Sequence, residues 1–129
     1  MTILLDTHAL HWWTTEPERL GPDAVLALEA DQELAVAAIT WWELAWLARR
    51  GRIGLAIPIR TLVTSLARDV RTMALTPSIA ATAAELPDSF PRDPIDRIIF
   101  ATAVEHGCRL VTKDARMHDH DPGGRVVVW

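Results

Sequence analysis

The chain has 129 residues, half of them hydrophobic, and a formal net charge of −4 at pH 7. This length and composition suit one domain, residues 1–129, with its own hydrophobic core. A single cysteine, Cys108, excludes an internal disulfide and fits a reducing compartment. The N-terminus has no basic segment typical of a signal peptide, and no apolar run approaches the roughly 20 residues of a transmembrane helix. We therefore expect a soluble, cytoplasmic protein that does not bind membranes.

The net charge alone does not indicate whether the chain binds nucleic acid. Proteins that hold nucleic acid through a basic surface are usually positively charged, and this chain is acidic. If four acidic side chains were neutralised by bound metal ions, however, the formal charge of the remainder would be zero. All basic residues except Lys113 are arginines, which suit bidentate contacts to phosphate. Charge is therefore uninformative about function here.

In the first half of the chain, apolar runs predict strands, and apolar residues at three- and four-residue steps predict helices. In chain order, the predicted elements are a strand at residues 2–5, helices at 7–13 and 22–31, a strand at 34–39, helices at 41–50 and 58–70, and a strand at 72–75. The run 34–39 is almost entirely apolar, as expected of a strand buried on both faces of a parallel sheet. Thr40 is the predicted N-cap of the helix that follows.

The second half begins with a helix of mostly small residues and a proline-rich loop. The predicted elements are helices at 77–86 and 93–107, a strand at 109–112, a short irregular segment from 114 and a last strand at 125–129. The helix 93–107 has both ends marked, because Asp93 can act as N-cap, Pro94 suits the first helical position, and Gly107 can end the helix.

Five short strands that alternate with helices indicate an α/β protein, a three-layer α/β/α fold with a mainly parallel sheet of about five strands. In open sheets of this kind, ligand sites lie beyond the carboxyl ends of the strands. Asp6 directly follows the first predicted strand, and Glu43 follows the second by one helical turn. Asp96 lies in the first turn of the helix 93–107, and Asp114 follows the fourth strand. We expect these acids to converge at one edge of the sheet.

Four converging carboxylates would repel one another, and some would be forced to take up protons. Hard divalent cations such as Mg²⁺ or Mn²⁺ relieve this repulsion, because they bind carboxylate oxygens and water. Such a site suits hydrolysis of a phosphodiester, in which one or two metal ions activate water and stabilise the leaving oxygen. The sequence thus predicts a catalytic, metal-binding set made of Asp6, Glu43, Asp96 and Asp114.

Each acid also has a purely structural interpretation. Thr40 and Glu43 have the spacing of a capping box, in which Glu43 would bond back to the Thr40 amide. Asp96 could stabilise the helix dipole, and Asp6 and Asp114 could be N-caps or turn residues. We favour the metal site because all four acids are expected at the same edge of the sheet.

Four segments of the chain carry a resemblance to a known family. In order, they are LLDTHAL, ITWWELAWL, RDPIDRIIFATA and LVTKDARM. This ordered set, which spans residues 3–117, resembles the signature segments of PIN-domain proteins, and its spacing is most similar to the VapC-type toxins of bacterial type II toxin–antitoxin systems. None of the four acids departs from the family pattern.

The resemblance implies an endoribonuclease that depends on Mg²⁺ or Mn²⁺ and cleaves RNA with water. It also implies a homodimer that is neutralised by a small cognate antitoxin bound across the active-site groove. Carried over residue by residue, the family's acids are Asp6, Glu43, Asp96 and Asp114. Asp93 is a second-tier candidate, favoured as an N-cap, and Thr112 matches a hydroxyl position that often lies near the metal.

Other polar and aromatic residues have less specific interpretations. Five tryptophans lie in two predicted helices near the proposed site, and we favour core, dimer or antitoxin contacts over stacking on RNA bases. The run 118–121, HDHD, lacks the spacing of a zinc site and is interpreted as a solvated turn. His8 and His11 are interpreted as packing or hydrogen-bonding residues and not as metal ligands.

Two alternative functions remain open at this point. One is a receiver-like regulatory α/β module whose acids hold a single Mg²⁺. Such a module has two adjacent acids after its first strand, whereas Asp6 stands alone, and it leaves Asp96 and Asp114 without a role. The other is a non-catalytic PIN-fold domain that only binds RNA or protein, and the intact set of acids argues against it.

Overall fold

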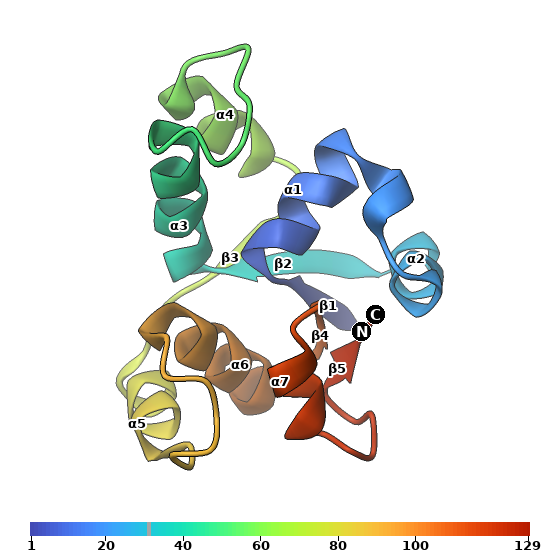
Figure 1. Ribbon diagram of the computed structural model, residues 1–129, viewed down its shortest axis with the longest axis vertical. Coiled ribbons are helices and arrows are strands. Elements are labelled where there is room, and N and C mark those ends of the chain that lie inside the picture. Colours follow the sequence, from blue (N-terminus) through green and yellow to red (C-terminus); the bar gives the residue numbers. More distant parts are fainter. Residues whose placement is uncertain (31) are drawn as a thin grey trace.

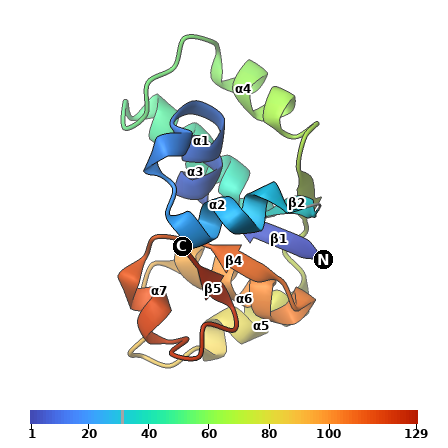
Figure 2. The ribbon, with the colours of Figure 1, turned by 90° about the vertical axis from the view of Figure 1, so that its right-hand side faces the viewer.

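The computed structural model describes residues 1–30 and 32–129. A five-stranded sheet lies between two layers of helices (Figure 1, Figure 2). The strands are β1 (Thr2–Leu5), β2 (Glu33–Ala37), β3 (Arg71–Met73), β4 (Arg109–Val111) and β5 (Val127–Val128). They pair in the order β3-β2-β1-β4-β5, and every pair is parallel. The predicted α/β/α fold with a parallel, five-stranded sheet is therefore confirmed.

The helices divide between the two faces of the sheet. The bounds are α1 (Thr7–Thr15), η1 (Pro17–Arg19), α2 (Pro22–Glu29), α3 (Ala38–Arg49), α4 (Ile59–Leu66), α5 (Pro77–Glu85), α6 (Pro94–His106) and α7 (Ala115–Asp119). Figure 1 shows α1, α3 and α4 above the sheet and α5 to α7 below it, and Figure 2 shows α2 on the same side as α1 and α3. The right-handed crossovers of parallel strands require such helical layers.

The central strand β1 and its neighbours are buried and apolar on both faces where each face meets a layer of helices. Along β1, Leu4 packs into the core shared with α6, whereas Ile3 and Leu5 pack into the core shared with α1 and α3. The neighbouring strands alternate in the same way, with Leu110 on the first side and Val111 on the second. This alternation with a period of two residues explains why the strands read as continuous apolar runs.

The boundary between β2 and α3 differs from the prediction. The strand ends at Ala37 and the helix begins at Ala38, so Thr40 lies inside the first turn and its predicted role as N-cap is wrong. Ala37 is the N-cap, and it has no side chain that can cap the helix. Within the described residues, the buried Thr40 hydroxyl has no hydrogen-bond partner. The capping-box interpretation of Glu43 is therefore excluded, because Glu43 lies beyond the first turn.

Other boundaries shift by a few residues. The predicted helix 22–31 corresponds to α2, which ends at Glu29, and residue 31 lies outside the described residues. The predicted helix 58–70 ends early, at Leu66, because the chain makes turns before it enters β3. The segment predicted as irregular after Asp114 is instead the short helix α7, capped by the Asp114 side chain.

Helix α6 begins where the sequence indicates, and Arg97 fixes that start. Asp93 Oδ1 accepts a hydrogen bond from the Ile95 amide at 2.8 Å, so the N-cap prediction is confirmed. Gly107 has the left-handed conformation, with φ of 63°, that ends the helix. The Arg97 guanidinium donates to backbone carbonyls of the preceding segment, those of Ala83, Leu86, Pro87, Phe90 and Pro91. These bonds tie the first turn of α6, which carries Asp96, to the loop after α5.

Candidate metal centre

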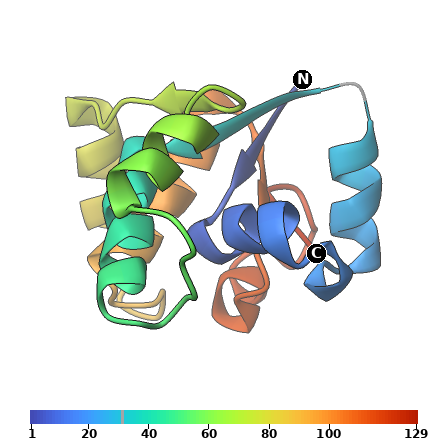
Figure 3. The same ribbon diagram turned by 90° about the horizontal axis from the view of Figure 1, so that it is seen from above.

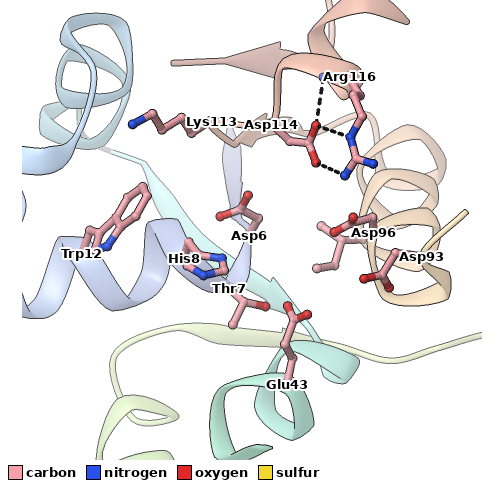
Figure 4. Close-up of a pocket in the computed structure, with 11 residues that line it drawn as sticks. Asp6, Thr7, His8, Trp12, Glu43, Asp93, Asp96, Lys113, Asp114 and Arg116 are labelled. Carbon is pink, nitrogen blue, oxygen red and sulfur yellow. Dashed lines mark hydrogen bonds and ion pairs between the residues drawn. The ribbon is translucent and has the colours of Figure 1, made fainter. Parts of the chain in front are cut away.

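A pocket of about 540 Å³ lies at the carboxyl edge of the sheet, between the starts of α1, α6 and α7 (Figure 4). All four predicted acids line it, and so does Asp93. The remaining lining residues are Thr7, His8, Trp12, Ile99, Lys113 and Arg116. The acids come from segments far apart in the sequence, so their meeting is a property of the fold and not of any one motif.

The carboxylates face a shared space, but they do not form a closed cage. No three acidic, histidine or cysteine side chains in the described part of the chain lie close enough together to hold a metal ion directly. A cation in this pocket would be reached by some carboxylates through water, and Mg²⁺ commonly keeps several of its waters in proteins.

Asp6 follows β1 directly and is the N-cap of α1. Its Oδ1 accepts a hydrogen bond from the Ala9 amide at 2.8 Å, which fixes the side chain. Burial raises the pKa of the Asp6 carboxyl, although hydrogen bonding to Thr112 and the Ala9 amide partly counteracts it, and the charge of Asp114 raises it further. The capping interpretation is thus correct for Asp6, and the residue also lines the pocket.

Glu43 projects into the pocket from α3 (Figure 4). Its pKa is raised, first by burial and also by the charges of Asp93 and Asp6. These charges place Glu43 within electrostatic reach of acids from two other elements. With the capping box excluded, the role that remains for this half-buried glutamate is to face the acidic pocket.

Asp96 is the electrostatic centre of the site. Burial and the charges of Asp93, Asp114, Glu43 and Asp6 raise the pKa of its carboxyl to about 7. The negative charge of every other acid in the pocket therefore raises the pKa of Asp96, as expected for a cluster that lacks a compensating cation. A divalent ion would reverse this effect, because it would favour the ionised carboxylates.

Asp114 is the one acid of the pocket that has a cationic partner. Its carboxylate caps α7 through the Arg116 amide at 2.9 Å and forms an ion pair with the Arg116 guanidinium at 3.2 Å. Burial raises the pKa of Asp114, but the hydrogen bonds from Arg116 outweigh burial and hold the pKa below its ordinary value. Asp114 is therefore the most readily ionised acid of the set.

Thr112 is completely buried between Asp6 and Asp114. Its hydroxyl accepts a hydrogen bond from the Asp114 amide at 3.1 Å, and hydrogen bonding to Thr112 lowers the pKa of Asp6. Thr112 does not line the pocket as the acids do. Thr112 therefore contacts the Asp6 side chain and the Asp114 backbone from outside the pocket lining.

Sequence reasoning missed the two cations of the pocket, Lys113 and Arg116. In Figure 4 they lie on opposite sides of Asp114, with Lys113 towards Trp12 and Arg116 towards Asp96. The Lys113 ammonium lies 5.8 Å from the centre of the Trp12 ring. Their position beside Asp114 in the fourth segment could have indicated them, since cations next to a phosphodiesterase site suit the anionic substrate.

The tryptophans divide into two groups. Trp12 is buried, and Trp13 and Trp41 pack against the core, as predicted. Trp42 and Trp46 are instead 53% and 41% exposed and stack on each other with ring centres 5.6 Å apart. This exposed pair on α3 is not part of the core of the chain.

The polar run 118–121 has a structural role. His118 Nε2 lies 2.8 Å from the Thr112 carbonyl, and Asp121 accepts hydrogen bonds from the amides of Arg125, Val126 and Val127. These contacts hold the last strand against the sheet. The run thus ends α7 and makes hydrogen bonds to the backbone, in place of the solvated turn that we predicted.

Comparison with known proteins identifies the family. The family model of the PIN domain matches residues 3–121. The chain belongs to the PIN-domain family. It is also 57% identical, over 99% of its length and 98% of the relative, to ribonuclease VapC22 of Mycobacterium tuberculosis (strain ATCC 25618 / H37Rv). The predicted resemblance to VapC-type PIN proteins is therefore confirmed.

Solved structures also match the fold of this chain. A toxin–antitoxin complex from Klebsiella pneumoniae matches with a TM-score of 0.70 and 25% identity, over 98% of this chain and 96% of that chain. VapBC2 from Rickettsia felis, bound to a DNA fragment from its promoter, matches with a TM-score of 0.71 and 13% identity, over 99% of this chain and 98% of that chain. At that identity the second match supports the fold alone.

These matches also separate the PIN-domain hypothesis from the receiver-like alternative. Receiver domains have the strand order 2-1-3-4-5, whereas this sheet has the order β3-β2-β1-β4-β5.

The described helices include none that is long and apolar enough to cross a membrane.

Proposed function

We propose that this chain is a metal-dependent endoribonuclease and the toxin of a type II toxin–antitoxin pair. One observation carries the proposal: Asp96 lies in a pocket where burial and the charges of four other acids raise its pKa to about 7. The full-length similarity to a ribonuclease supports the same activity. The proposed catalytic and metal-binding residues are Asp6, Glu43, Asp96 and Asp114, with Asp93 and Thr112 in supporting positions.

The donor set fits a hard divalent cation. The pocket offers carboxylate oxygens, whereas softer metals prefer cysteine and histidine ligands. The raised pKa values of Asp6, Glu43 and Asp96 are what a carboxylate cluster shows without its cation. We therefore propose Mg²⁺ or Mn²⁺ as the cofactor.

The bound ion would supply the Lewis acidity that activates water and stabilises the leaving oxygen. The residues of the chain position the reactants. The Asp6 and Asp114 carboxylates accept hydrogen bonds from backbone amides of α1 and α7, so both acids are held at the starts of helices that border the pocket. Lys113 and Arg116 flank the acids and would bind the negative charge of the RNA backbone. Water would add to phosphorus and the P–O3′ bond would break, leaving a 5′-phosphate and a 3′-hydroxyl.

The proposed protein partner is an antitoxin. A chain that is 25% identical to this one has been solved in a toxin–antitoxin complex from Klebsiella pneumoniae. In this chain, the exposed and stacked Trp42 and Trp46 form an apolar surface on α3. Exposed aromatic side chains of this kind are enriched at protein interfaces. This surface supports contact with an antitoxin, and a homodimer of the chain is proposed from the family resemblance.

A cleavage assay with metal and chelator tests the proposed activity. Purified protein, free of antitoxin, is incubated with labelled structured RNA in Mg²⁺, in Mn²⁺ and in EDTA, and the ends of the fragments are mapped. We expect cleavage only with metal and fragments that carry 5′-phosphates. Cleavage that persists in EDTA, or fragments with 2′,3′-cyclic phosphates, would contradict a metal-activated water as the nucleophile.

A further inference from the structure

A second hollow adjoins the acidic pocket along α1. It has a volume of about 340 Å³, and its lining includes His8, His11, Trp12, Arg19 and Arg52. His8 and Trp12 also line the acidic pocket, so the two hollows share a wall. The volume lies within the range typical of small-ligand sites, ~300–1,000 Å³, and is sufficient for one nucleotide.

The far side of this hollow is the segment between α3 and α4. Ile53 anchors the segment, because its side chain is only 9% exposed and packs into the core shared with α1 and α3. Figures 1 and 3 show the segment beside α1, opposite η1. The hollow is therefore built from anchored elements, with Arg19 of η1 and Arg52 of the segment at its rim.

The charges of the two hollows are opposite. Five acids line the first, whereas Arg19 and Arg52 line the second together with a single acid, Glu16. Glu16 lies 3.4 Å from Arg19, in an exposed pair that contributes little to stability and leaves the guanidinium able to bind other anions. A polyanion that enters the acidic pocket gains its favourable charge contacts in this neighbouring hollow.

Trp12 links the cations of the two hollows. The Arg19 guanidinium lies 4.5 Å from the centre of the Trp12 ring, and the Lys113 ammonium lies 5.8 Å from it. Because Trp12 is only 9% exposed, its ring is held in place and orients these cations instead of offering a face to a base. Arg19, Lys113 and Arg52 thus form a cationic path that leads from Asp114 along α1.

We propose that the second hollow is a subsite for the RNA nucleotide next to the scissile phosphate. Arg19 and Arg52 bind the phosphates on either side of this nucleotide, and Lys113 binds the strand where it enters the acidic pocket. Arginine suits this role because its guanidinium contacts phosphate through two parallel hydrogen bonds. The inference rests on the proposed ribonuclease function, since it assigns the RNA path around that same site.

RNA binding by a cleavage-deficient protein tests the subsite. The probe is a short, fluorescein-labelled single-stranded RNA of randomised sequence, and anisotropy is measured over a series of KCl concentrations in Mg²⁺ with the Asp96→Asn protein. The test pair adds Arg19→Gln and Arg52→Gln, and the control pair adds Arg60→Gln and Arg68→Gln, which are exposed and line neither hollow. Both pairs remove the same charge.

We expect the test pair to weaken RNA binding roughly tenfold and to reduce the slope of log K against log[salt] by about 1.4, since each single-strand phosphate contact contributes ~0.7. The control pair should change affinity by less than about twofold. Arg52→Gln alone leaves the Arg19 contact with Trp12 intact, so it should keep the wild-type melting temperature. It should reduce the salt slope by about half as much as the test pair does.

Equal losses in the test and control pairs would overturn the subsite, because they would show only general attraction to a cationic surface. Wild-type cleavage of RNA together with unchanged binding in the test pair would also overturn it while leaving the proposed function intact. Failure of the wild type to cleave RNA, with no RNA binding by the Asp96→Asn protein, would overturn the proposed function and the subsite together.

Discussion

Arg116 holds both carboxylate oxygens of Asp114. Its amide and Nε donate to Oδ1 at 2.9 and 3.4 Å, and its Nη2 donates to Oδ2 at 3.2 Å. The guanidinium therefore occupies the side of Asp114 that faces Asp96 and Asp93, whose charges also act on Arg116. The Arg116 side chain is 66% exposed, so it can move away when a stronger cation binds.

Arg116→Gln should strengthen metal binding. The variant removes a cation that competes for Asp114, and because exposed ion pairs of this kind are weak, the Kd for Mn²⁺ should fall by only about 1.5- to 5-fold. Isothermal titration calorimetry at low ionic strength measures this directly. Arg125→Gln, in the segment before β5, is the control for the loss of one positive charge. Weaker Mn²⁺ binding by Arg116→Gln would show that Arg116 supports the metal site.

Asp96→Asn should stabilise the metal-free protein more at pH 8 than at pH 5. The folded-state pKa of about 7 lies above the ordinary value of 3.8, so folding favours the protonated carboxyl and stability falls as pH rises between these values. At pH 8, ionisation of the buried Asp96 lowers the free energy of unfolding of the wild type, whereas the neutral asparagine side chain of the variant causes no such loss. The melting temperature in EDTA should rise by several degrees at pH 8.

The control for this measurement is Asp69→Asn, which neutralises an exposed acid outside the pocket. Saturating Mg²⁺ should raise the melting temperature of the wild type and should have much less effect on Asp96→Asn. A stabilisation by Asp96→Asn that is equal at both pH values would mean that the raised pKa is not the cause.

Arg97→Lys should destabilise the fold by about 2 kcal/mol. The guanidinium donates through three nitrogens to the carbonyls that precede α6, and a lysine ammonium cannot reach this set of acceptors. Chemical denaturation should show a lower midpoint with an unchanged slope. Arg92→Lys, an exposed neighbour, should change stability by less than about 0.5 kcal/mol. Equal stability of the two variants would show that the hydrogen bonds from Arg97 to the loop after α5 do not stabilise the fold.

Replacement of Trp42 and Trp46 by serine should separate partner binding from catalysis. Both side chains are substantially exposed, so the melting temperature should change little. If the pair contacts the antitoxin, the Kd of the complex should rise by at least roughly tenfold, as for aromatic residues at interface centres. RNA cleavage by the free variant should stay at the wild-type rate. An unchanged Kd for the antitoxin would place its interface elsewhere on the chain.

Much of the fold could be predicted from the sequence, because parallel strands covered on both faces must be apolar throughout and α6 has side-chain signals at both ends. The start of α3 could not be predicted. Its N-cap is Ala37, which has no capping group, and the following Ala38 and Ile39 are compatible with either strand or helix. Thr40 is a common N-cap residue and so gave a stronger local signal for the helix start. In the structure, it is buried inside the first turn of α3.

The acids of the candidate site could be predicted because each follows a strand or begins a helix, and strand ends share one edge of the sheet. The position of the two cations beside Asp114 was also visible in the sequence, but their contacts were not. Arg116 pairs with a carboxylate in the same short helix, and Lys113 lies over Trp12, a residue distant in sequence. The contact between Lys113 and Trp12 depends on the packing of α1 against the segment after β4. The same packing buries Trp12 and leaves Trp42 exposed, although both read as helical tryptophans.

The most direct test of the four-acid active site is the single-turnover cleavage rate of Asp6→Asn, Glu43→Gln, Asp96→Asn and Asp114→Asn. The rates are measured on RNA that the wild type cleaves, at saturating metal, after circular dichroism has shown that each variant is folded. We predict that each substitution lowers the rate constant by on the order of 100-fold or more, as removal of one electrostatic group from an active site commonly does. A folded variant that cleaves at the wild-type rate would contradict the assignment of its acid to the active site.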